Sequence, residues 1–215
     1  MTNLLVRRIA TGKWDENCYL IHIDGCDGLL IDPGADFETI SAAISESRVT
    51  PRAIVNTHGH FDHVGAVAQA QEYYNIPFYL HPADSRLLKR ANSFRALFEQ
   101  SSTIRIPHID VELGNTTETL VFAGMELEIL HTPGHTEGSV CIRIGENVFT
   151  GDLLFKGHIG RTDLPGGNRE KLRESLRLVC TLPRSTVLYP GHGDTSTIQD
   201  ELAGNAALIE ALNGN

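Results

Sequence analysis

The chain has 215 residues, 41% of them hydrophobic, and a formal net charge of -9 at pH 7 with its ten histidines counted as neutral. A chain of this length buries about 70% of the surface that its unfolded form exposes, so we expect a single domain spanning residues 1–215. The acidic balance argues against a protein that binds the phosphate backbone of nucleic acids, because such a surface would be basic.

The N-terminal segment and the cysteines indicate the compartment. Residues 1–8 contain no long apolar segment after a basic one, so no signal peptide is predicted, and no apolar run approaches the length of a membrane span. The cysteines are widely spaced, without a Cys-x-x-Cys pair, at Cys18, Cys26, Cys141 and Cys180. We expect them to be small buried hydrophobic residues rather than disulfides or a zinc knuckle. We therefore expect a cytoplasmic protein that does not bind a membrane.

The first part of the chain is predicted to form strands and then a helix. Short apolar runs separated by glycine-containing turns predict a meander of strands at residues 4–9, 18–23 and 29–31. Asp32 follows the last of these, either as a turn residue or as a carboxylate that hydrogen-bonds a ligand histidine. Asp36 is expected to cap a helix that ends before Pro51.

The most informative segment reads Thr57-His58-Gly59-His60-Phe61-Asp62-His63. It lies between the apolar run at residues 53–55 and helix-like residues 64–68, which predicts a strand, a ligand loop and a helix. Imidazole and carboxylate groups are the ligands that zinc and similar metals take from nitrogen and oxygen donors. A histidine-rich tract can also be a solvated loop, but this one is internal and lies between two patterned elements. We therefore predict a metal site here, and Asp62 would also cap the following helix.

A basic segment follows the next predicted strand, residues 78–80. After His81, which we expect to be structural, apolar residues at helical spacing predict a helix over residues 85–100. This helix also carries local positive charge, at Arg86, Lys89, Arg90 and Arg95. Charged helix faces are usually just solvated. The alternative is that the segment overhangs the site and receives an anionic substrate.

The second half of the chain again alternates strands and helices. A hairpin at residues 119–122 and 125–130 is followed by strands at 140–144 and 147–149. Two helices are expected after these strands, one capped by Asn168 and the last one opened by Ser196. Three further apolar runs are each followed by a glycine and then by a residue that can bind metal: His135, Asp152 and His192. Because rigid strands position the loops at their ends, we expect these side chains to join those of residues 57–63.

The set, in its order and local context, resembles the metallo-β-lactamase superfamily, whose hallmark is a His-x-His-x-Asp-His loop followed by a distant His, Asp and His. The resemblance implies an α/β fold, a four-layer αβ/βα sandwich with the metal site at one edge between the two sheets. It implies two divalent metal ions, zinc in the first place with iron and manganese as alternatives. One metal would be held by His58, His60 and His135, the second by Asp62, His63 and His192, and Asp152 would bridge them.

Residues 151–167 reduce the number of activities that the resemblance allows. This segment, and Gly160-Arg161-Thr162-Asp163 above all, is similar to glyoxalase II-like (hydroxyacylglutathione hydrolase-like) proteins and to persulfide dioxygenases. The chain is most similar to the compact, single-domain hydrolases, since it ends at Asn215 without the C-terminal helical extension of the longer type. By that resemblance Arg161 would bind a carboxylate of glutathione, its alternative role being an ordinary salt bridge.

The implied function is hydrolysis of a glutathione thioester such as S-lactoylglutathione by a metal-bound hydroxide, with Asp62 as the catalytic residue that orients it. The competing hypotheses are a persulfide dioxygenase with one iron, a hydrolase of lactones or other esters, and a non-catalytic metal-binding module. The expected partner is a small-molecule acyl substrate, and we expect a monomer.

Overall fold

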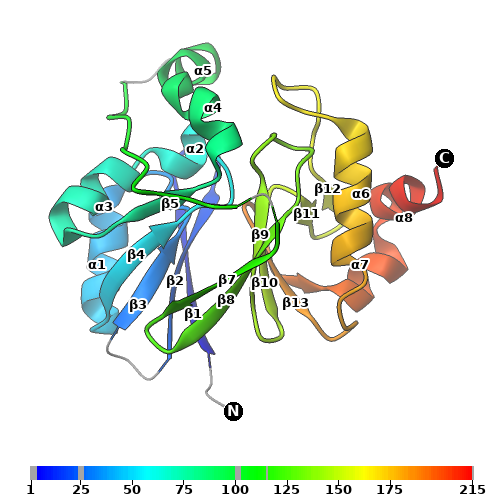
Figure 1. Cartoon of the computed structure of the whole chain (residues 1–215), viewed down its shortest axis with the longest axis horizontal. Coiled ribbons are helices and arrows are strands. Elements are labelled where there is room, and N and C mark those ends of the chain that lie inside the picture. Colours follow the sequence, from blue (N-terminus) through cyan, green and yellow to red (C-terminus); the bar gives the residue numbers. More distant parts are fainter. Residues whose placement is uncertain (1–3, 24–26, 100–102, 115, 215) are drawn as a thin grey trace.

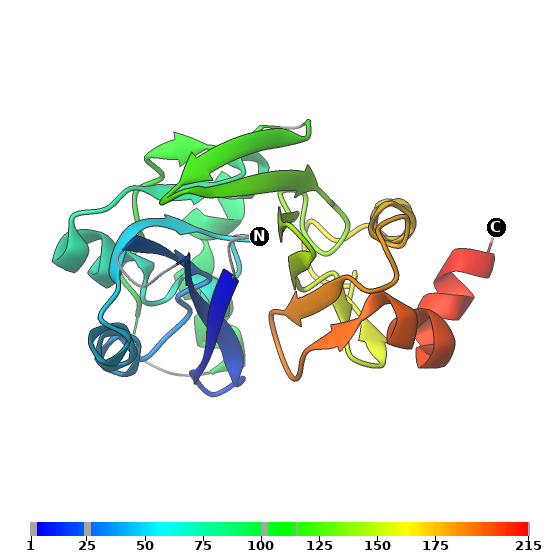
Figure 2. The same ribbon diagram turned by 90° about the horizontal axis from the view of Figure 1, so that it is seen from below.

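The computed structural model describes residues 4–23, 27–99, 103–114 and 116–214. Two six-stranded sheets face each other within this part of the chain, and helices cover the outer face of each sheet (Figure 1). The view turned by 90° places the helices of the N-terminal and C-terminal halves on opposite sides of the molecule (Figure 2). The expected four-layer αβ/βα sandwich is therefore confirmed.

The first sheet has the order β1-β2-β3-β4-β5-β6. Its strands are β1 (Leu4–Thr11), β2 (Glu16–Ile23), β3 (Asp27–Ile31), β4 (Thr50–Val55), β5 (Phe78–Leu80) and β6 (Val111–Glu112). Pairing is antiparallel from β1 to β3 and parallel from β3 to β6. The connections contain α1 (Phe37–Ser47), α2 (Phe61–Val64), α3 (Val67–Tyr74), the 3-10 turn η1 (Pro82–Asp84), α4 (Ser85–Lys89) and α5 (Ala91–Phe98).

The second sheet has the order β14-β13-β10-β9-β8-β7. Its strands are β7 (Glu118–Phe122), β8 (Met125–His131), β9 (Val140–Ile144), β10 (Asn147–Gly151), β13 (Val187–Pro190) and β14 (Ser196–Thr197). A small separate hairpin is formed by β11 (Leu154–Phe155) and β12 (His158–Ile159). The helices on this side are α6 (Arg169–Val179), α7 (Ile198–Gly204) and α8 (Ala206–Asn213).

Alternation along the central strands gives each sheet two apolar faces. In β2, Leu20 packs in the outer cluster beneath the helices of the first half, whereas Tyr19 and Ile21 belong to the cluster between the sheets. The second sheet contributes Leu127 and Phe149 to that central cluster. Each such buried side chain stabilises the fold by roughly 1.5–3 kcal/mol. The apolar contacts therefore hold the two sheets face to face, and the loops at their shared edge keep defined positions.

Two carboxylates do not cap the helices that the sequence assigned to them. Asp36 occupies the position before α1, but with a left-handed φ of 47° and without a side-chain cap. Its carboxylate instead accepts a hydrogen bond from Gly12 N at 2.9 Å. Asp62 lies inside the first turn of α2, after the cap position at His60, and makes no capping bond.

Two predicted helices are each divided in the structure. The helix expected over residues 85–100 separates at Arg90 into α4 and α5, and Gln100 lies outside the described residues. Asn168 caps α6 as predicted, but Ser196 pairs in β14, so Thr197 caps α7 instead of it. Asn205 then ends α7 and caps α8, which divides the predicted last helix.

The cysteines of the described part are free thiols. Cys18 and Cys141 are buried and Cys180 is half-buried, while Cys26 lies outside the described residues. Among the described residues, the helices are all too short or too polar to cross a bilayer.

Candidate metal centre

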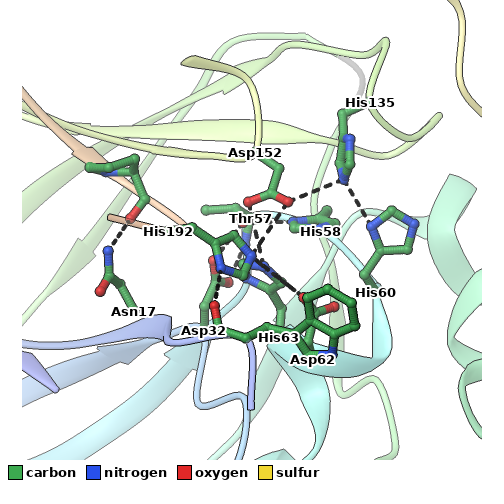
Figure 3. A network of polar contacts seen from close by, with 12 residues as sticks. Asn17, Asp32, Thr57, His58, His60, Asp62, His63, His135, Asp152 and His192 are labelled. Atoms are coloured by element: carbon green, nitrogen blue, oxygen red, sulfur yellow. Dashed lines mark hydrogen bonds and ion pairs between the residues drawn. The ribbon is translucent and has the colours of Figure 1, made fainter. Parts of the chain in front are cut away.

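The predicted ligands follow the ends of strands, and their side chains point toward one another (Figure 3). His58 follows β4, His135 follows β8, Asp152 follows β10 and His192 follows β13. Backbone hydrogen bonds join these loops: Val140 N donates to Thr57 O, and Gly191 N donates to Gly151 O, both at 2.8 Å. The loops of both sheets are thereby fixed to one another.

The first group consists of His58, His60 and His135, all buried, with ligand atoms within 4.8 Å of one another. His135 Nε2 lies 2.9 Å from His60 Nδ1. Two imidazole nitrogens that face each other at this distance can share either a proton or a cation.

The second group consists of Asp62, His63 and His192, again with ligand atoms within 4.8 Å of one another. Asp152 lies between the two groups (Figure 3). Its Oδ1 is 3.5 Å from His63 Nε2, and its Oδ2 is 3.4 Å from His135 Nε2. The structure thus brings together all seven residues that the sequence singled out.

Hydrogen bonds determine which nitrogen of each ring faces the site. His135 Nδ1 lies 2.9 Å from Arg161 O, and His192 Nδ1 lies 2.9 Å from Trp14 O. A carbonyl oxygen only accepts, so both Nδ1 atoms carry hydrogen and it is the Nε2 atom of each ring that faces the site. Such orientation of ligand rings by outer hydrogen bonds is usual in metal sites.

Asp32 orients two more of the histidines. Its Oδ2 accepts from His63 Nδ1 at 3.1 Å and from Thr57 Oγ1 at 2.6 Å, and its Oδ1 accepts from Thr57 N at 2.7 Å. Because the Thr57 hydroxyl donates to Asp32, its oxygen is left to accept from His58 Nδ1 at 3.0 Å. Of the two roles considered for Asp32, the carboxylate that supports ligand histidines is the one observed.

Unpartnered atoms and charge show that the donor set fits cations. His58 Nε2 and Asp152 Oδ1 are buried, and neither has a hydrogen-bond partner among the described residues. Burial disfavours a charged His63, yet the carboxylates of Asp152, Asp62 and Asp32 raise its pKa to about 10. Between these carboxylates the protein therefore stabilises positive charge.

Two further donors, His60 and Asp62, keep the protonation states that coordination needs. Burial and the neighbouring His135 lower the pKa of His60 to about 3, which keeps the imidazole neutral. Burial by itself would raise the pKa of Asp62, but the surrounding histidines, His63 foremost, hold it below its usual value. Neutral imidazoles with ionised carboxylates are a set that zinc, iron and manganese all accept.

Asp84 is a supporting residue that the sequence did not reveal. It is buried, and its Oδ2 accepts from Gly59 N at 2.9 Å and from Thr136 Oγ1 at 2.8 Å. Its Oδ1 accepts from Gly138 N at 2.8 Å. Asp84 therefore joins the loop of His58 and His60 to the loop of His135, although it binds no ligand residue directly.

The start of β2 and the turn that precedes it support His192 in a similar way. Asn17 N donates to Gly191 O at 2.7 Å, and Asn17 Nδ2 donates to Pro190 O at 3.0 Å and Gly193 O at 2.8 Å. The backbone carbonyl of Trp14, in the turn between β1 and β2, accepts from His192 Nδ1. Neither residue carried a signal in the sequence, because both act through long-range backbone contacts.

A pocket of about 240 Å³, which we call the metal-side pocket, opens onto the centre. Asp62, Asp152 and three of the ligand histidines line it together with Phe61, Phe94, Phe98 and Trp14. Arg161 lines it as well, with a half-exposed side chain whose guanidinium binds Asp163 through bonds of 2.7 and 2.8 Å. His81, expected to be structural, stacks on His131 with ring centroids 4.3 Å apart and belongs to neither ligand group.

Comparison with known proteins identifies the family to which the chain is similar. The family model described as metallo-beta-lactamase superfamily matches residues 11–192. Hydroxyacylglutathione hydrolase GloC of Haemophilus influenzae is 35% identical over 93% of this chain and 96% of its own length. Among solved structures, TTHA1623 in a di-iron-bound form is 38% identical with a TM-score of 0.85, covering 94% of this chain and 99% of that one. BLEG-1, a B3 metallo-beta-lactamase, is 32% identical with a TM-score of 0.89, covering 94% and 98%.

Proposed function

The chain belongs to the metallo-β-lactamase superfamily, and on that premise we propose that it is a binuclear metal-dependent hydrolase, acting as a single domain on a glutathione thioester such as S-lactoylglutathione. The observation that carries the proposal is the pair of ligand groups on either side of Asp152, beside a pocket lined by aromatic residues and Arg161. The likeness to hydroxyacylglutathione hydrolase GloC supports the substrate class.

The residues would divide the metals between them. His58, His60 and His135 would hold one ion, Asp62, His63 and His192 the other, and Asp152 would contact both. Bound divalent ions supply a water whose pKa falls to about 7 and polarise the carbonyl under attack. Zinc is the expected metal, and the di-iron form of TTHA1623 makes iron the first alternative.

Asp62 is the proposed catalytic residue. Its carboxylate stays ionised, lines the metal-side pocket and lies 3.5 Å from His192 Nε2. An ionised carboxylate there would accept a hydrogen bond from the attacking water and orient its lone pair toward the thioester carbon. Water adds to that carbon, the carbon–sulfur bond breaks, and the products are a hydroxy acid and the free thiol of glutathione.

The walls of the pocket suit the acyl group and one end of glutathione. Phe61 stacks on Phe98 with ring centroids 6.2 Å apart, which gives an apolar wall that excludes water from the thioester. We propose that Arg161 binds the glycyl carboxylate. Because Asp163 now holds the guanidinium, the substrate would have to compete with an exposed ion pair, and such pairs are weak.

The proposal is tested by metal content per chain on protein purified without added metal, with S-lactoylglutathione hydrolysis measured on the same sample. We expect two metals per chain and thioester turnover, and loss of both after Asp152→Ala. One iron without thioester turnover, together with persulfide-dependent oxygen uptake, would instead identify a persulfide dioxygenase. A parallel assay with nitrocefin and a lactone covers β-lactam hydrolysis, to which the name of BLEG-1 refers, and the ester alternative. Faster turnover of either compound than of the thioester would overturn the proposed substrate.

A further inference from the structure

A second pocket, which we call the flanking pocket, lies next to the metal-side pocket. It has a volume of about 250 Å³ and lies between α4 and the loops at residues 136–137 and 165–166. Phe94 lines both pockets, and Thr136 in the flanking pocket directly follows His135 in the other. The two pockets therefore adjoin at Phe94 and at the loop that carries His135 and Thr136.

The flanking pocket is lined by charged groups of both signs. One of them, Asp84, is buried and accepts hydrogen bonds from Gly59, Thr136 and Gly138, so three others are available to a ligand. Arg86 and Arg90 lie four residues apart and line it from α4 and its end, while Glu137 lines it from the loop that carries His135. No ion pair or side-chain hydrogen bond involves these three side chains within the described part of the chain. By contrast, the guanidinium of Arg161 in the metal-side pocket is already bound to Asp163.

We infer that the flanking pocket is the subsite for a zwitterionic α-amino-acid terminus, with Arg86 and Arg90 binding its carboxylate and Glu137 its ammonium group. This inference rests on the proposed function, because the γ-glutamyl end of a glutathione thioester is such a terminus. A ligand with one anionic group and one cationic group on the same carbon matches a pocket lined by two guanidinium groups from α4 and its end and by a carboxylate from the loop after His135. Glutathione has two carboxylates, so Arg161 and the pair on α4 would bind opposite ends of it.

The test compares two substrates and two sets of variants. S-lactoylglutathione carries the γ-glutamyl residue, whereas S-lactoyl-N-acetylcysteinylglycine lacks it. In the double variant Arg86→Ala/Arg90→Ala we expect KM for S-lactoylglutathione to rise by about 10- to 100-fold, as for lost hydrogen bonds between charged groups. The kcat, the metal content and the KM for the truncated thioester should stay unchanged. Lys89→Ala is the matched control, because it removes a positive charge from α4 at a residue that does not line the flanking pocket.

Glu137→Gln tests the ammonium contact. It should raise KM for S-lactoylglutathione. The KM for S-lactoyl-N-acetylcysteinylglycine should stay at its wild-type value, because this truncated thioester has no ammonium group. An unchanged KM in the arginine double variant, or an equal rise for the truncated thioester, would overturn the subsite while leaving the hydrolase proposal intact.

Calorimetry with S-methylglutathione separates this inference from the proposed function. If the wild type hydrolyses no thioester but binds S-methylglutathione with an affinity that depends on Arg86 and Arg90, the hydrolase proposal fails and the subsite stands. If the wild type neither hydrolyses the thioester nor binds S-methylglutathione, both fail.

Discussion

Replacing Asp84 tests how the two ligand loops of the first metal group are held together. Asp84→Ala leaves the backbone donors of Gly59 and Gly138 without their acceptor in a buried place, whereas the Thr136 hydroxyl can donate to Ser139 Oγ at 2.7 Å instead. An unsatisfied buried donor costs roughly 1–3 kcal/mol, so for these two donors we expect a loss of about 2–6 kcal/mol in the free energy of unfolding. In Asp84→Asn one amide oxygen can keep the Gly59 and Thr136 bonds while the NH₂ group faces Gly138 N, so the loss should be about 1–3 kcal/mol.

The metal affinity should fall unequally at the two groups. Asp84 joins the loops of His60 and His135 but contacts neither Asp62 nor His192. Loss of a residue that supports metal ligands costs about 10- to 100-fold in affinity. We therefore expect this loss at the His58, His60 and His135 group, and a much smaller one at the group that contains His192.

Guanidinium unfolding of the metal-free protein measures the stability, and zinc titration against a chelator measures the two affinities. Asp110→Asn serves as the control, because Asp110 also accepts from a backbone N–H, that of Phe78 at 2.9 Å, but lines a pocket away from the ligands. It should cost stability without changing metal affinity. Wild-type zinc affinity at both groups in Asp84→Asn and Asp84→Ala would refute the reasoning.

Further predictions concern the ligands and their nearest support. Asp152→Ala should remove metal from both groups and lower kcat/KM by more than about 100-fold, because loss of a ligand costs more than loss of a residue that supports one. Full activity with two metals bound would contradict this. The control His22→Ala should leave the metal content unchanged. Asp32→Asn should weaken zinc binding by about 10- to 100-fold in chelator competition, because it removes the acceptor of His63 Nδ1 and Thr57 Oγ1. The His63 pKa is raised from 6.5 to about 10, so its contribution to the stability of the metal-free protein should be fully present below about pH 6.5 and lost as the pH rises through about 10. Near neutral pH, zinc should displace this proton, and calorimetry in buffers of different ionisation enthalpy should report about one proton released; no buffer dependence would contradict it.

The ligand set could be predicted from the sequence because each ligand is encoded locally. His58, His60, Asp62 and His63 lie within one loop, and His135, Asp152 and His192 each follow a recognisable apolar run and a glycine or a Gly-containing turn. Strand alternation and helical spacing similarly placed most elements within a few residues of their observed bounds. All of these features can be predicted from residues that are close to one another in the sequence.

Helix ends and breaks were harder to predict because several residues compete for them. Ser196 and Thr197 are both good caps, and the choice depends on the pairing of Ser196 in β14 with Leu188 in β13. The break at Arg90 contains neither proline nor glycine, so tertiary packing decides it. The side chain of Asp36 bonds to Gly12, 24 residues away in the sequence, rather than to its own helix.

The order of the strands explains why Asp84 was not predicted and how such residues can be found. β4, which leads into the His58 loop, lies between β3 and β5 in the first sheet. Asp32 follows β3 and bonds to Thr57, and Asp84 follows β5 and bonds to Gly59. The ligand loop is thus held from both sides by carboxylates that follow the neighbouring parallel strands. Periodicity predicts the strands but not which of them are neighbours, so the sequence alone offered Asp32 and left Asp84 among the ordinary acidic residues. Once the strand order is known, a carboxylate just beyond each strand that flanks a ligand loop is the residue to test for support of the metal.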